Sequence, residues 1–300
     1  MGKIQIIAEI ANAHQGQIKI AEKLALEAFK AKADVVKFQI YFAEELLVEK
    51  HPRFLHFKKQ SFSSEEWINL INKTKKLGIK IFCDIFGLKA LNLAKSLDVD
   101  GFKIHSSDLN NKYLLSSLNE LDSSKEIIIS CGGSNIREIY YALNILKNEH
   151  KITLMHGFQS YPTAIEDSNL RRLDWLKRNF GDLYNIGYQD HVAGENIFAN
   201  VLPLLAIMRG AKTLEKHITL DRSAKGVDYY SSLEPNEFKD FVSNVGKSLS
   251  ALGEKEVLFS PDEINYRNTV KKRIVSTKEM KKGEIIKFNY LTFKRTDKNE

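Results

Sequence analysis

The sequence predicts a (β/α)8 TIM barrel, an α/β fold, followed by a short, incomplete β segment. Short apolar runs of strand-like composition alternate with helix-like segments over about the first 250 residues. Eight strand–helix units in that length fit an eight-stranded barrel, whereas an open doubly wound sheet, the alternative, has no need of eight regular repeats. No GxGxxG or GxxxxGK[ST] sequence follows a predicted strand, which argues against a nucleotide-binding sheet.

The predicted strands are short apolar runs that recur along the chain. In order they are Lys3–Ile10, Asp34–Ile40, Ile79–Ile85, Gly101–Ser106, Glu126–Cys131, Ile152–His156, Tyr184–Tyr188 and Lys212–His217. A buried strand of a parallel sheet has this continuous apolar character, because helices cover one of its faces and the barrel interior covers the other.

Apolar residues at helical spacing predict helices between these strands. Three of the stripes are Ile20, Leu24 and Ala28; Ile197, Val201, Leu205 and Met208; and Phe238, Phe241, Val245, Leu249 and Leu252. Ser63 and Glu66 form a capping box at the start of another helix, which Gly78 closes. Pro235 and Gly253 bound the last helix, since proline suits the first helical turn and glycine suits the residue after the end.

The regular alternation of apolar strand-like and helix-like segments ends after Gly253. We therefore predict a barrel in residues 1–253, a polar and irregular linker in 254–269 and a short β segment in 270–300. The last segment is too small to bury a core of its own, so we expect it to lie on the barrel or on a partner subunit. The long connection Tyr41–Phe62 is typical of a lid or a binding loop.

Composition narrows the class of protein. Hydrophobic residues make up 43% of the chain and charged residues 28%, as in an ordinary globular protein. We expect no membrane span and no signal peptide, and the placement of Cys83 and Cys131 in apolar runs suits the reducing cytoplasm. The net charge of +7 has no basic stripe interleaved with aromatic residues, so we expect no nucleic-acid partner; an anionic small substrate could use the charge.

Polar residues fall at the ends of all eight predicted strands. In strand order they are Glu9; Lys37 and Gln39; Asp84; Lys103, with Ser106 and Asp108 just beyond; Ser130; His156, followed by Tyr161; Asp190 and His191; and Glu215 and His217. Burying that many ionisable groups costs several kcal/mol each unless they pair or hold a ligand. The active site of such a barrel lies at these strand ends, so the pattern predicts one there.

Two pairs within this set indicate the chemistry. Lys37 and Lys103 would repel each other across a shared cavity, and an anion such as phosphate or carboxylate between them would relieve the repulsion. His191 and His217 end neighbouring strands, so their imidazoles can meet. Spacing alone leaves open whether they bind a metal, form a hydrogen-bonded pair or are unrelated core residues.

At this level of detail the sequence resembles the sialic acid synthase family, which includes the N-acetylneuraminate, legionaminate and pseudaminate synthases. The resemblance runs from Ile6 to Arg295 and rests on EIANAHQG, VKFQ, FKIHSSDLNN, IISCGGS, SYPTAIED, IGYQDH and LEKHITLDRSAKGVDYYSSLEP, in this order. The last motif is highly specific, whereas VKFQ alone is weak. RIVSTKEMKKGEIIKFNYLTFKR resembles the opening of the family's antifreeze-like (SAF) domain, which stops about halfway here.

The resemblance implies an enzyme that condenses phosphoenolpyruvate with an open-chain N-acylated hexosamine, giving a nonulosonic acid and phosphate. It also implies a homodimer and a divalent metal, Mn2+ or Mg2+. The resemblance implies that His191 and His217 hold the metal and that Glu9 lies near the metal-bound water. It implies that Lys37 and Lys103 hold phosphoenolpyruvate, together with Ser106 and Ser130. The residues that it implies for contact with the sugar are Gln39, Asp108, Tyr161 and Asp228. Glu215 would fix the rotamer of a lysine, and Asp190 would support the metal site from behind.

Several positions depart from the family pattern. Asp84 stands where a small or hydroxyl residue is usual, and a carboxylate beside a bound phosphate is repulsive unless it points away or is protonated. The other departures are His105 and Ser107 for glycines, Asp108 for a longer Glu, Gln159 for Asn or Ser, and Gln189 for a small residue.

Two other functions remain open from the sequence. One is condensation of phosphoenolpyruvate with a phosphorylated sugar, for which Arg53, Lys58 and Lys59 in the long connection could bind the acceptor phosphate. The other is a non-catalytic sugar-binding relative whose phosphate site has decayed, an idea motivated by Asp84 and Gln189. The acceptor sugar itself is beyond what these residues specify.

Overall fold

The computed structural model describes residues 3–146, 150–253, 256 and 258–296. Eight parallel strands form a closed barrel in which each strand pairs with the next and β1 pairs with β8. The strands are β1 Gln5–Glu9, β2 Val35–Tyr41, β3 Lys80–Phe86, β4 Gly101–Ile104, β5 Glu126–Ser130, β6 Lys151–His156, β7 Asn185–Asp190 and β8 Thr213–Ile218, with a short β9, Ser232–Leu233, beside β8. The predicted (β/α)8 fold is confirmed.

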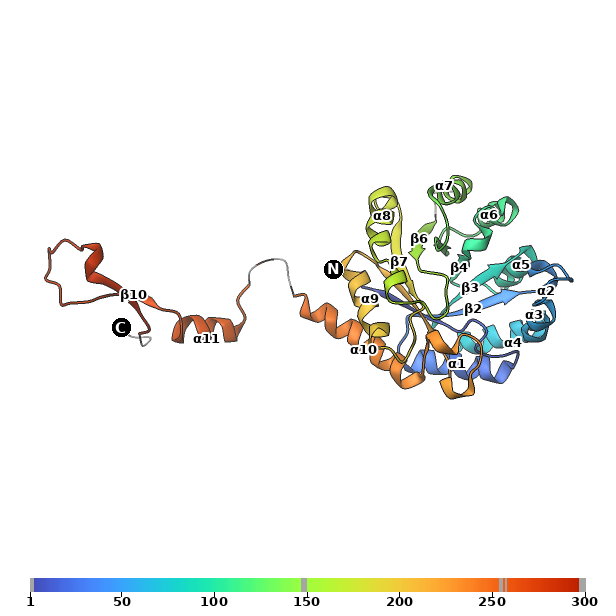
Figure 1. Cartoon of the computed structure of the whole chain (residues 1–300), viewed down its shortest axis with the longest axis horizontal. Helices are drawn as coiled ribbons and strands as arrows, with labels where there is room; N and C mark the ends of the chain where they lie inside the picture. The colour runs from blue at the N-terminus through green and yellow to red at the C-terminus, as the bar shows by residue number, and fades with distance from the viewer. Residues whose placement is uncertain (1–2, 147–149, 254–255, 257, 297–300) are drawn as a thin grey trace. The chain divides into compact units, whose positions relative to one another are not determined.

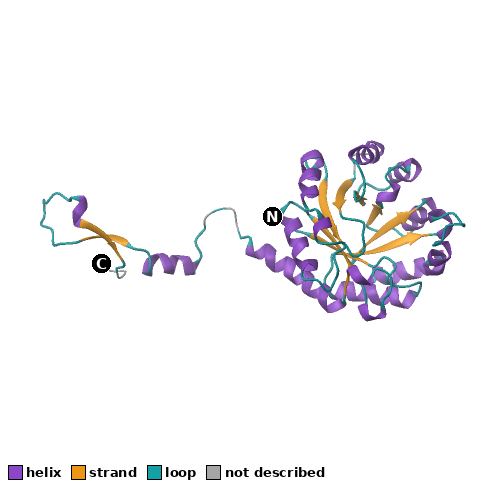
Figure 2. Ribbon diagram, viewed as in Figure 1, coloured by secondary structure: helices purple, strands orange, loops and turns teal. Residues whose placement is uncertain are grey.

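Helices surround this barrel on the outside (Figures 1 and 2). They are α1 Ile18–Lys30, α2 Ala43–Leu46, α3 Phe54–Gln60, α4 Ser64–Lys75, α5 Leu88–Ser96, α6 Lys112–Leu118, α7 Ile136–Ile145, α8 Arg171–Phe180, α9 Phe198–Met208 and α10 Pro235–Ala251. The predicted capping box is present at α4, where Ser63 Oγ accepts a hydrogen bond from the Glu66 amide. No helix in the described part of the chain is long and apolar enough to cross a membrane.

Three element predictions need correction. The fourth strand ends at Ile104, because Ser106–Asp108 form a 3-10 turn that the His105 side chain caps. The connection Tyr41–Phe62 is not an open loop, since it contains α2 and α3. The linker 254–269 is irregular only in part, because Ser260 and Glu263 form a capping box that starts α11, Pro261–Thr269. Residues 254, 255 and 257 of that linker lie outside the described residues.

The barrel interior is layered. Its middle layer is apolar and consists of Ile7, Val35, Phe82, Ile128 and Met155, all at most 1% exposed. Phe82 can fill the barrel because Gly101 lies beside it, where a Cβ would come within 2.6 Å of the phenyl ring. This apolar layer lies between the opposite mouth of the barrel and the polar side chains at the strand C-terminal ends. We call the space around those polar side chains the chamber, and the apolar layer closes it from below.

The chain divides into two compact units, Met1–Leu249 and Ser250–Glu300. In the second unit, β10, Arg273–Ser276, pairs with β11, Leu291–Lys294, as an antiparallel ribbon. The boundaries 1–253, 254–269 and 270–300, and the SAF-like character of the last segment, stay predictions. Residues 297–300 of that segment lie outside the described residues.

Candidate active site at the strand C-terminal ends

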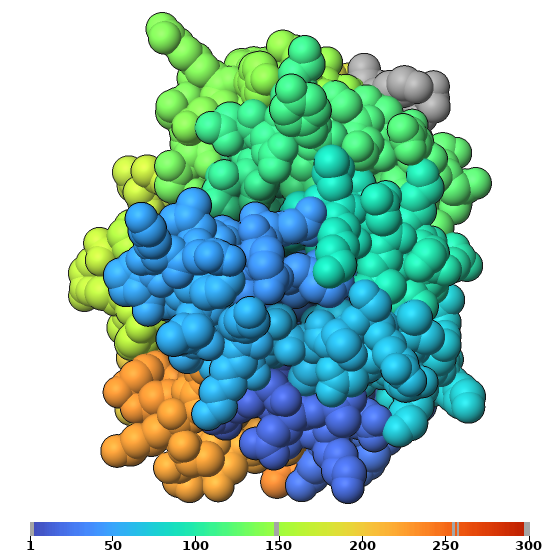
Figure 3. Space-filling model, turned by 90° about the vertical axis from the view of Figure 1, so that its right-hand side faces the viewer, coloured from blue at the N-terminus to red at the C-terminus, as the bar shows by residue number. Residues whose placement is uncertain are grey.

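The C-terminal ends of the strands open toward the side of the barrel on which α2 and α3 lie. Figure 3 views that side directly, and the segment after β2, in mid-blue, extends across the middle of it. His14, just after β1, stacks on Phe62 at the end of this segment, with ring centroids 4.4 Å apart. The Tyr41 hydroxyl donates a hydrogen bond of 2.8 Å to Asn12 Oδ1. These two contacts tie the end of β2 and the segment that follows it to the turn after β1.

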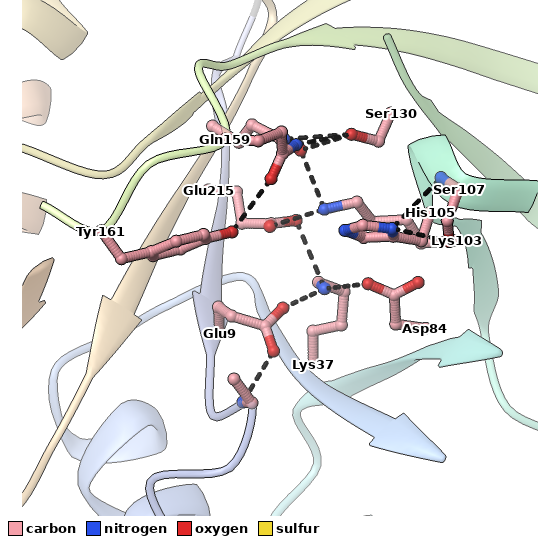
Figure 4. A network of polar contacts seen from close by, with 12 residues as sticks. Glu9, Lys37, Asp84, Lys103, His105, Ser107, Ser130, Gln159, Tyr161 and Glu215 are labelled. Carbon is pink, nitrogen blue, oxygen red and sulfur yellow. Dashed lines mark hydrogen bonds and ion pairs between the residues drawn. The ribbon is translucent and has the colours of Figure 1, made fainter. Parts of the chain in front are cut away.

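Two buried lysines form the centre of the chamber (Figure 4). Lys37 Nζ contacts Glu9 Oε2, lies 3.1 Å from Asp84 Oδ2 and lies 3.6 Å from Glu215 Oε2. Lys103 Nζ donates to Glu215 Oε1 at 2.7 Å and to Gln189 Oε1 at 2.9 Å. None of the five charged side chains is more than 4% exposed, so these charges interact mainly with one another and not with water.

Strand register accounts for most of this cluster. Glu9 lies opposite Lys37, Asp84 lies opposite Lys103, and Gln189 lies opposite Glu215 on neighbouring strands. The bond from Lys103 on β4 to Glu215 on β8 crosses the barrel instead. The expectation that Glu215 holds a lysine is therefore confirmed, and Glu215 lies close enough to both lysines to link the two halves of the chamber.

The balance of charges shifts the pKa values of these carboxyl groups in opposite directions. Burial raises the pKa of Glu9 to about 7; Glu215 and Asp84 add to this effect, and Lys37 and Lys103 oppose it. Burial alone would also raise the pKa of Glu215, but Lys103 and Lys37 outweigh it and lower that pKa to about 2. Glu9 is thus the carboxyl group poised to exchange a proton near neutral pH.

A chain of neutral groups continues from Lys103 along the other wall. Gln189 Nε2 donates to Ser130 Oγ at 3.0 Å, and Gln159 Nε2 lies 3.4 Å from the same hydroxyl. The Tyr161 hydroxyl donates to Gln159 Oε1 at 3.1 Å. Ser130 and Tyr161, both predicted site residues, are therefore joined to Lys103 through two glutamines (Figure 4).

His191 and His217 meet at one edge of this chamber. Their ring centroids are 5.4 Å apart, and the Tyr161 ring lies 4.4 Å from His191. His191 Nδ1 is 2.7 Å from the Phe158 carbonyl, to which it can donate, leaving Nε2 with a free lone pair. Burial lowers the pKa of His191 to about 4 and that of His217 well below its usual value, so both rings are neutral, as metal ligation requires.

The two imidazoles fit a divalent metal only as part of its ligand set. Among the described residues there is no group of three or more His, Cys, Asp and Glu side chains arranged to hold a metal ion. A catalytic metal keeps open positions for water and substrate, so two protein ligands suit an ion that substrate oxygens help to coordinate. Metal ligation itself stays a prediction.

The other predicted substrate contacts lie around the rim. Gln39 is half-buried on β2, and Ser106 and Asp108 lie in the 3-10 turn after β4. Asp108 accepts hydrogen bonds from Asn111 Nδ2 at 2.9 Å and Ser107 Oγ at 3.1 Å, so it also shapes its own turn. Burial raises the pKa of Asp228, and the positive charge of Arg53, in the segment after β2, opposes that shift.

Asp190, predicted to support the metal site from behind, is bonded to a buried lysine and to the backbone next to His191. Asp190 accepts from Lys216 Nζ at 2.5 Å, from the Tyr188 hydroxyl at 3.1 Å and from the Val192 amide at 3.3 Å. Strand alternation turns Asp190 and Lys216 away from the face that carries Gln189 and Glu215. Asp190 thus braces the backbone on either side of His191, and this pair lies outside the chamber.

Asn12, Tyr41 and His14, whose contacts hold the end of β2 and the segment after it, have no role that the sequence alone predicts. The available signal was the polar run that continues past the first strand in EIANAHQG. Polar residues beyond a strand end are common in loops, so the pattern alone did not distinguish an anchor from a solvated turn.

Comparison with known proteins agrees with this architecture. The family model described as the NeuB family matches residues 24–257. The N,N'-diacetyllegionaminic acid synthase of Campylobacter jejuni is 34% identical over 98% of this chain and 91% of its own length. An uncharacterized protein of Methanocaldococcus jannaschii is 36% identical over 97% of this chain and 84% of its own.

A solved structure shows the same fold. The N-acetylneuraminic acid (sialic acid) synthetase of Leptospira borgpetersenii, crystallised with citrate, superposes with a TM-score of 0.78 at 32% identity. The match covers 90% of this chain and 93% of that one.

Proposed function

This chain belongs to the NeuB family and is an enzyme of the nonulosonic acid synthase type, and we propose that it condenses phosphoenolpyruvate with an open-chain N-acylated hexosamine to give a nonulosonic acid and phosphate. The observation that carries the proposal is the dry chamber in which Lys37 and Lys103 lie beside the His191–His217 pair. Cations in such a chamber suit an anionic substrate, and a pair of neutral imidazoles suits a metal.

In the proposed reaction, C3 of phosphoenolpyruvate forms a bond to the aldehyde carbon of the sugar. Water adds to C2, and phosphate then leaves with the bridging oxygen, so the C–O bond of phosphoenolpyruvate breaks. Lys37 and Lys103 would neutralise the carboxylate and phosphate of this substrate, with Ser130 and Ser106 as hydrogen-bond donors. Tyr161, Gln39, Asp108 and Asp228 would hold and orient the acceptor.

Glu9 is proposed to orient or deprotonate the attacking water. Its Oε1 accepts a 2.7 Å hydrogen bond from the Ala11 amide, which fixes the carboxylate in the chamber. A base whose pKa lies near the working pH is effective, because it is ionised yet still basic enough to take a proton.

His191 and His217 would hold the divalent metal, Mn2+ or Mg2+. When bound, the metal would act as a Lewis acid on the acceptor aldehyde. This chain's contribution is to keep both rings neutral and to fix the His191 ring through the Phe158 carbonyl.

The homodimer and the SAF-like nature of residues 270–300 are further parts of this proposal. The antiparallel pairing of β10 and β11 supports a β segment there. The family resemblance is the only support for the homodimer.

Phosphate release from phosphoenolpyruvate with Mn2+ tests the function. The acceptors are N-acetylmannosamine, its 6-phosphate, a 2,4-diacetamido-6-deoxymannose and its altrose analogue. We expect release that depends on one unphosphorylated acceptor and is abolished by EDTA. Preference for the 6-phosphate would favour the phosphorylated-sugar alternative. No phosphate release with any acceptor, from protein that is folded and binds metal, would favour a non-catalytic relative. Full activity of a folded His217→Ala variant would contradict the metal ligands.

The pH dependence of the reaction should report on Glu9. Below its pKa of about 7 the carboxyl group is protonated and cannot serve as a base; above it the group is ionised and active. We therefore expect kcat/KM to rise with pH through a limb near 7, well above the usual range of a glutamate. Glu9→Gln should remove this limb and lower kcat/KM by about 100-fold or more. If the rise of kcat/KM near pH 7 persists in Glu9→Gln, the titrating group is not Glu9.

A further inference from the structure

Both lysine ammonium groups of the chamber are already bonded to groups of this chain. Lys37 Nζ has Glu9 and Asp84 as partners, and Lys103 Nζ has Glu215 and Gln189. An ammonium group has three donors, so a multiply charged anion that needs both lysines must displace some of these partners or compete with them. The proposed function does not by itself say which partners give way.

The chamber also carries an excess of negative charge. Three carboxylates, Glu9, Asp84 and Glu215, face two ammonium groups, which leaves a formal charge of −1 when all are ionised (2 − 3). Asp84 Oδ1 is buried and has no hydrogen-bond partner among the described residues. A phosphate or carboxylate entering the chamber would meet this uncompensated oxygen, and like charges repel strongly where water is excluded.

The three carboxylates are not held equally. Glu9 is fixed by the Ala11 amide, and Glu215 reaches both lysines. Asp84 contacts Lys37 through one oxygen, at 3.1 Å, with its other oxygen unpartnered among the described side chains. One oxygen of Glu9 and one of Glu215 also lack a hydrogen-bond partner among the described residues, but each of these carboxylates has two contacts, whereas Asp84 has only its contact with Lys37.

Gln189 is bonded to Lys103 much as Asp84 is bonded to Lys37. Its amide accepts from Lys103 Nζ and donates to Ser130 Oγ, so it uses two groups that an anion would need. The fold leaves room for it, because a Cβ on Gly157 would lie 2.1 Å from Gln189 Cγ. A neutral amide costs less to turn aside than a carboxylate, since no charge is left unpaired.

We propose that Asp84 and Gln189 occupy the anion subsite as internal stand-ins for the substrate, one on each lysine, and that both must turn aside when the anion binds. They are thus affinity-determining residues that weaken anion binding and keep the empty chamber's lysines paired. The inference rests on the proposed function only in treating the two-lysine chamber as the anion site. Glu9 and Glu215 keep their places in the bound state.

Equilibrium binding of inorganic phosphate tests this without turnover. The proteins are the full-length wild type, Asp84→Asn, Asp84→Ser, Gln189→Ala and the Asp84→Asn/Gln189→Ala double variant, titrated by calorimetry. Asp98→Asn is the matched control, because Asp98 is exposed and pairs with Lys125 outside the chamber. Thermal melts establish that each variant is folded, and the near-isosteric Asp84→Asn is the variant expected to keep the cluster's packing.

Removing the Asp84 charge should tighten phosphate binding by about 10-fold or more, since a like charge lies a few ångströms from the ligand. Gln189→Ala should tighten it by about 3-fold, because Lys103 and Ser130 lose a neutral competitor. KM for phosphoenolpyruvate should fall in the same order with kcat changed less. Asp98→Asn should bind as the wild type does.

Unchanged or weaker phosphate binding in both Asp84 variants would overturn the proposal, because Asp84 would then orient Lys37 for the anion instead of competing with it. Absence of phosphate binding in every folded protein would also overturn it. Tighter binding without turnover on any acceptor would instead count against the proposed reaction and leave the inference standing. Turnover together with unchanged phosphate affinity in the Asp84 variants would support the proposed reaction and overturn the inference about Asp84.

Discussion

Replacing Lys103 by methionine is expected to lower kcat/KM by about 1,000-fold. The Lys103 side chain is 4% exposed, and its ammonium group donates to Glu215 at 2.7 Å and to Gln189 at 2.9 Å, so it is a preorganised cation shielded from water. Removing one such stabilising group typically costs about 100- to 1,000-fold in rate. Methionine retains the length of the side chain without its charge, so the loss measures the cation.

The measurement is steady-state phosphate release with the preferred acceptor, at a temperature where the melt shows the variant to be folded. A stability loss of about 3 kcal/mol accompanies the substitution, because Glu215 keeps only Lys37 as a cationic neighbour. Lys95→Met is the matched control, since Lys95 pairs with Glu120 on the outside and is 42% exposed. Activity of Lys103→Met within about tenfold of wild type would remove Lys103 from the catalytic residues.

The second large effect should be on stability. Asp190→Ala is expected to lower the free energy of unfolding by about 3–5 kcal/mol, because it leaves the Lys216 ammonium group buried and without its carboxylate. Lys216 is 0% exposed, and Asp190 Oδ2 lies 2.5 Å from its Nζ. The Tyr188 hydroxyl and the Val192 amide would lose an acceptor as well.

Chemical denaturation of the single and double variants separates the pair from its burial. In Asp190→Ala/Lys216→Met both charges of this pair are gone, so no unpaired charge remains at this place and most of the lost stability should return. Asp174→Ala breaks a partly exposed pair with Arg209 and should cost less than about 1 kcal/mol. An Asp190→Ala cost as small as that of Asp174→Ala would show that Lys216 finds another partner or water.

The sequence was a good guide to the barrel because local patterns report on local structure. The apolar runs and capping signals, such as Ser63 with Glu66, located strands and helices to within a few residues. Errors arose where side chains override backbone patterns. His105 caps a turn that shortens β4, and Ser260 with Glu263 starts a helix within the predicted linker. Both signals were visible in the sequence but competed with stronger neighbouring patterns.

The polar residues that end the strands can be read from the sequence, and they indicate that Glu9, Lys37, Lys103, His191 and His217 share one end of a barrel. How these residues pair depends on the closed three-dimensional fold. Strand alternation sets the face of each side chain, but closure of the barrel brings Glu215 on β8 to Lys103 on β4.

The same closure decided the roles of Asp84 and Gln189. In the sequence they are isolated departures, whereas in the structure each is bonded to one of the two lysines. Asp190, the residue before the predicted metal ligand His191, pairs with Lys216 outside the chamber. The physical reason is that period-2 alternation is local and readable, while contacts across a closed sheet depend on strand number, register and side-chain reach together.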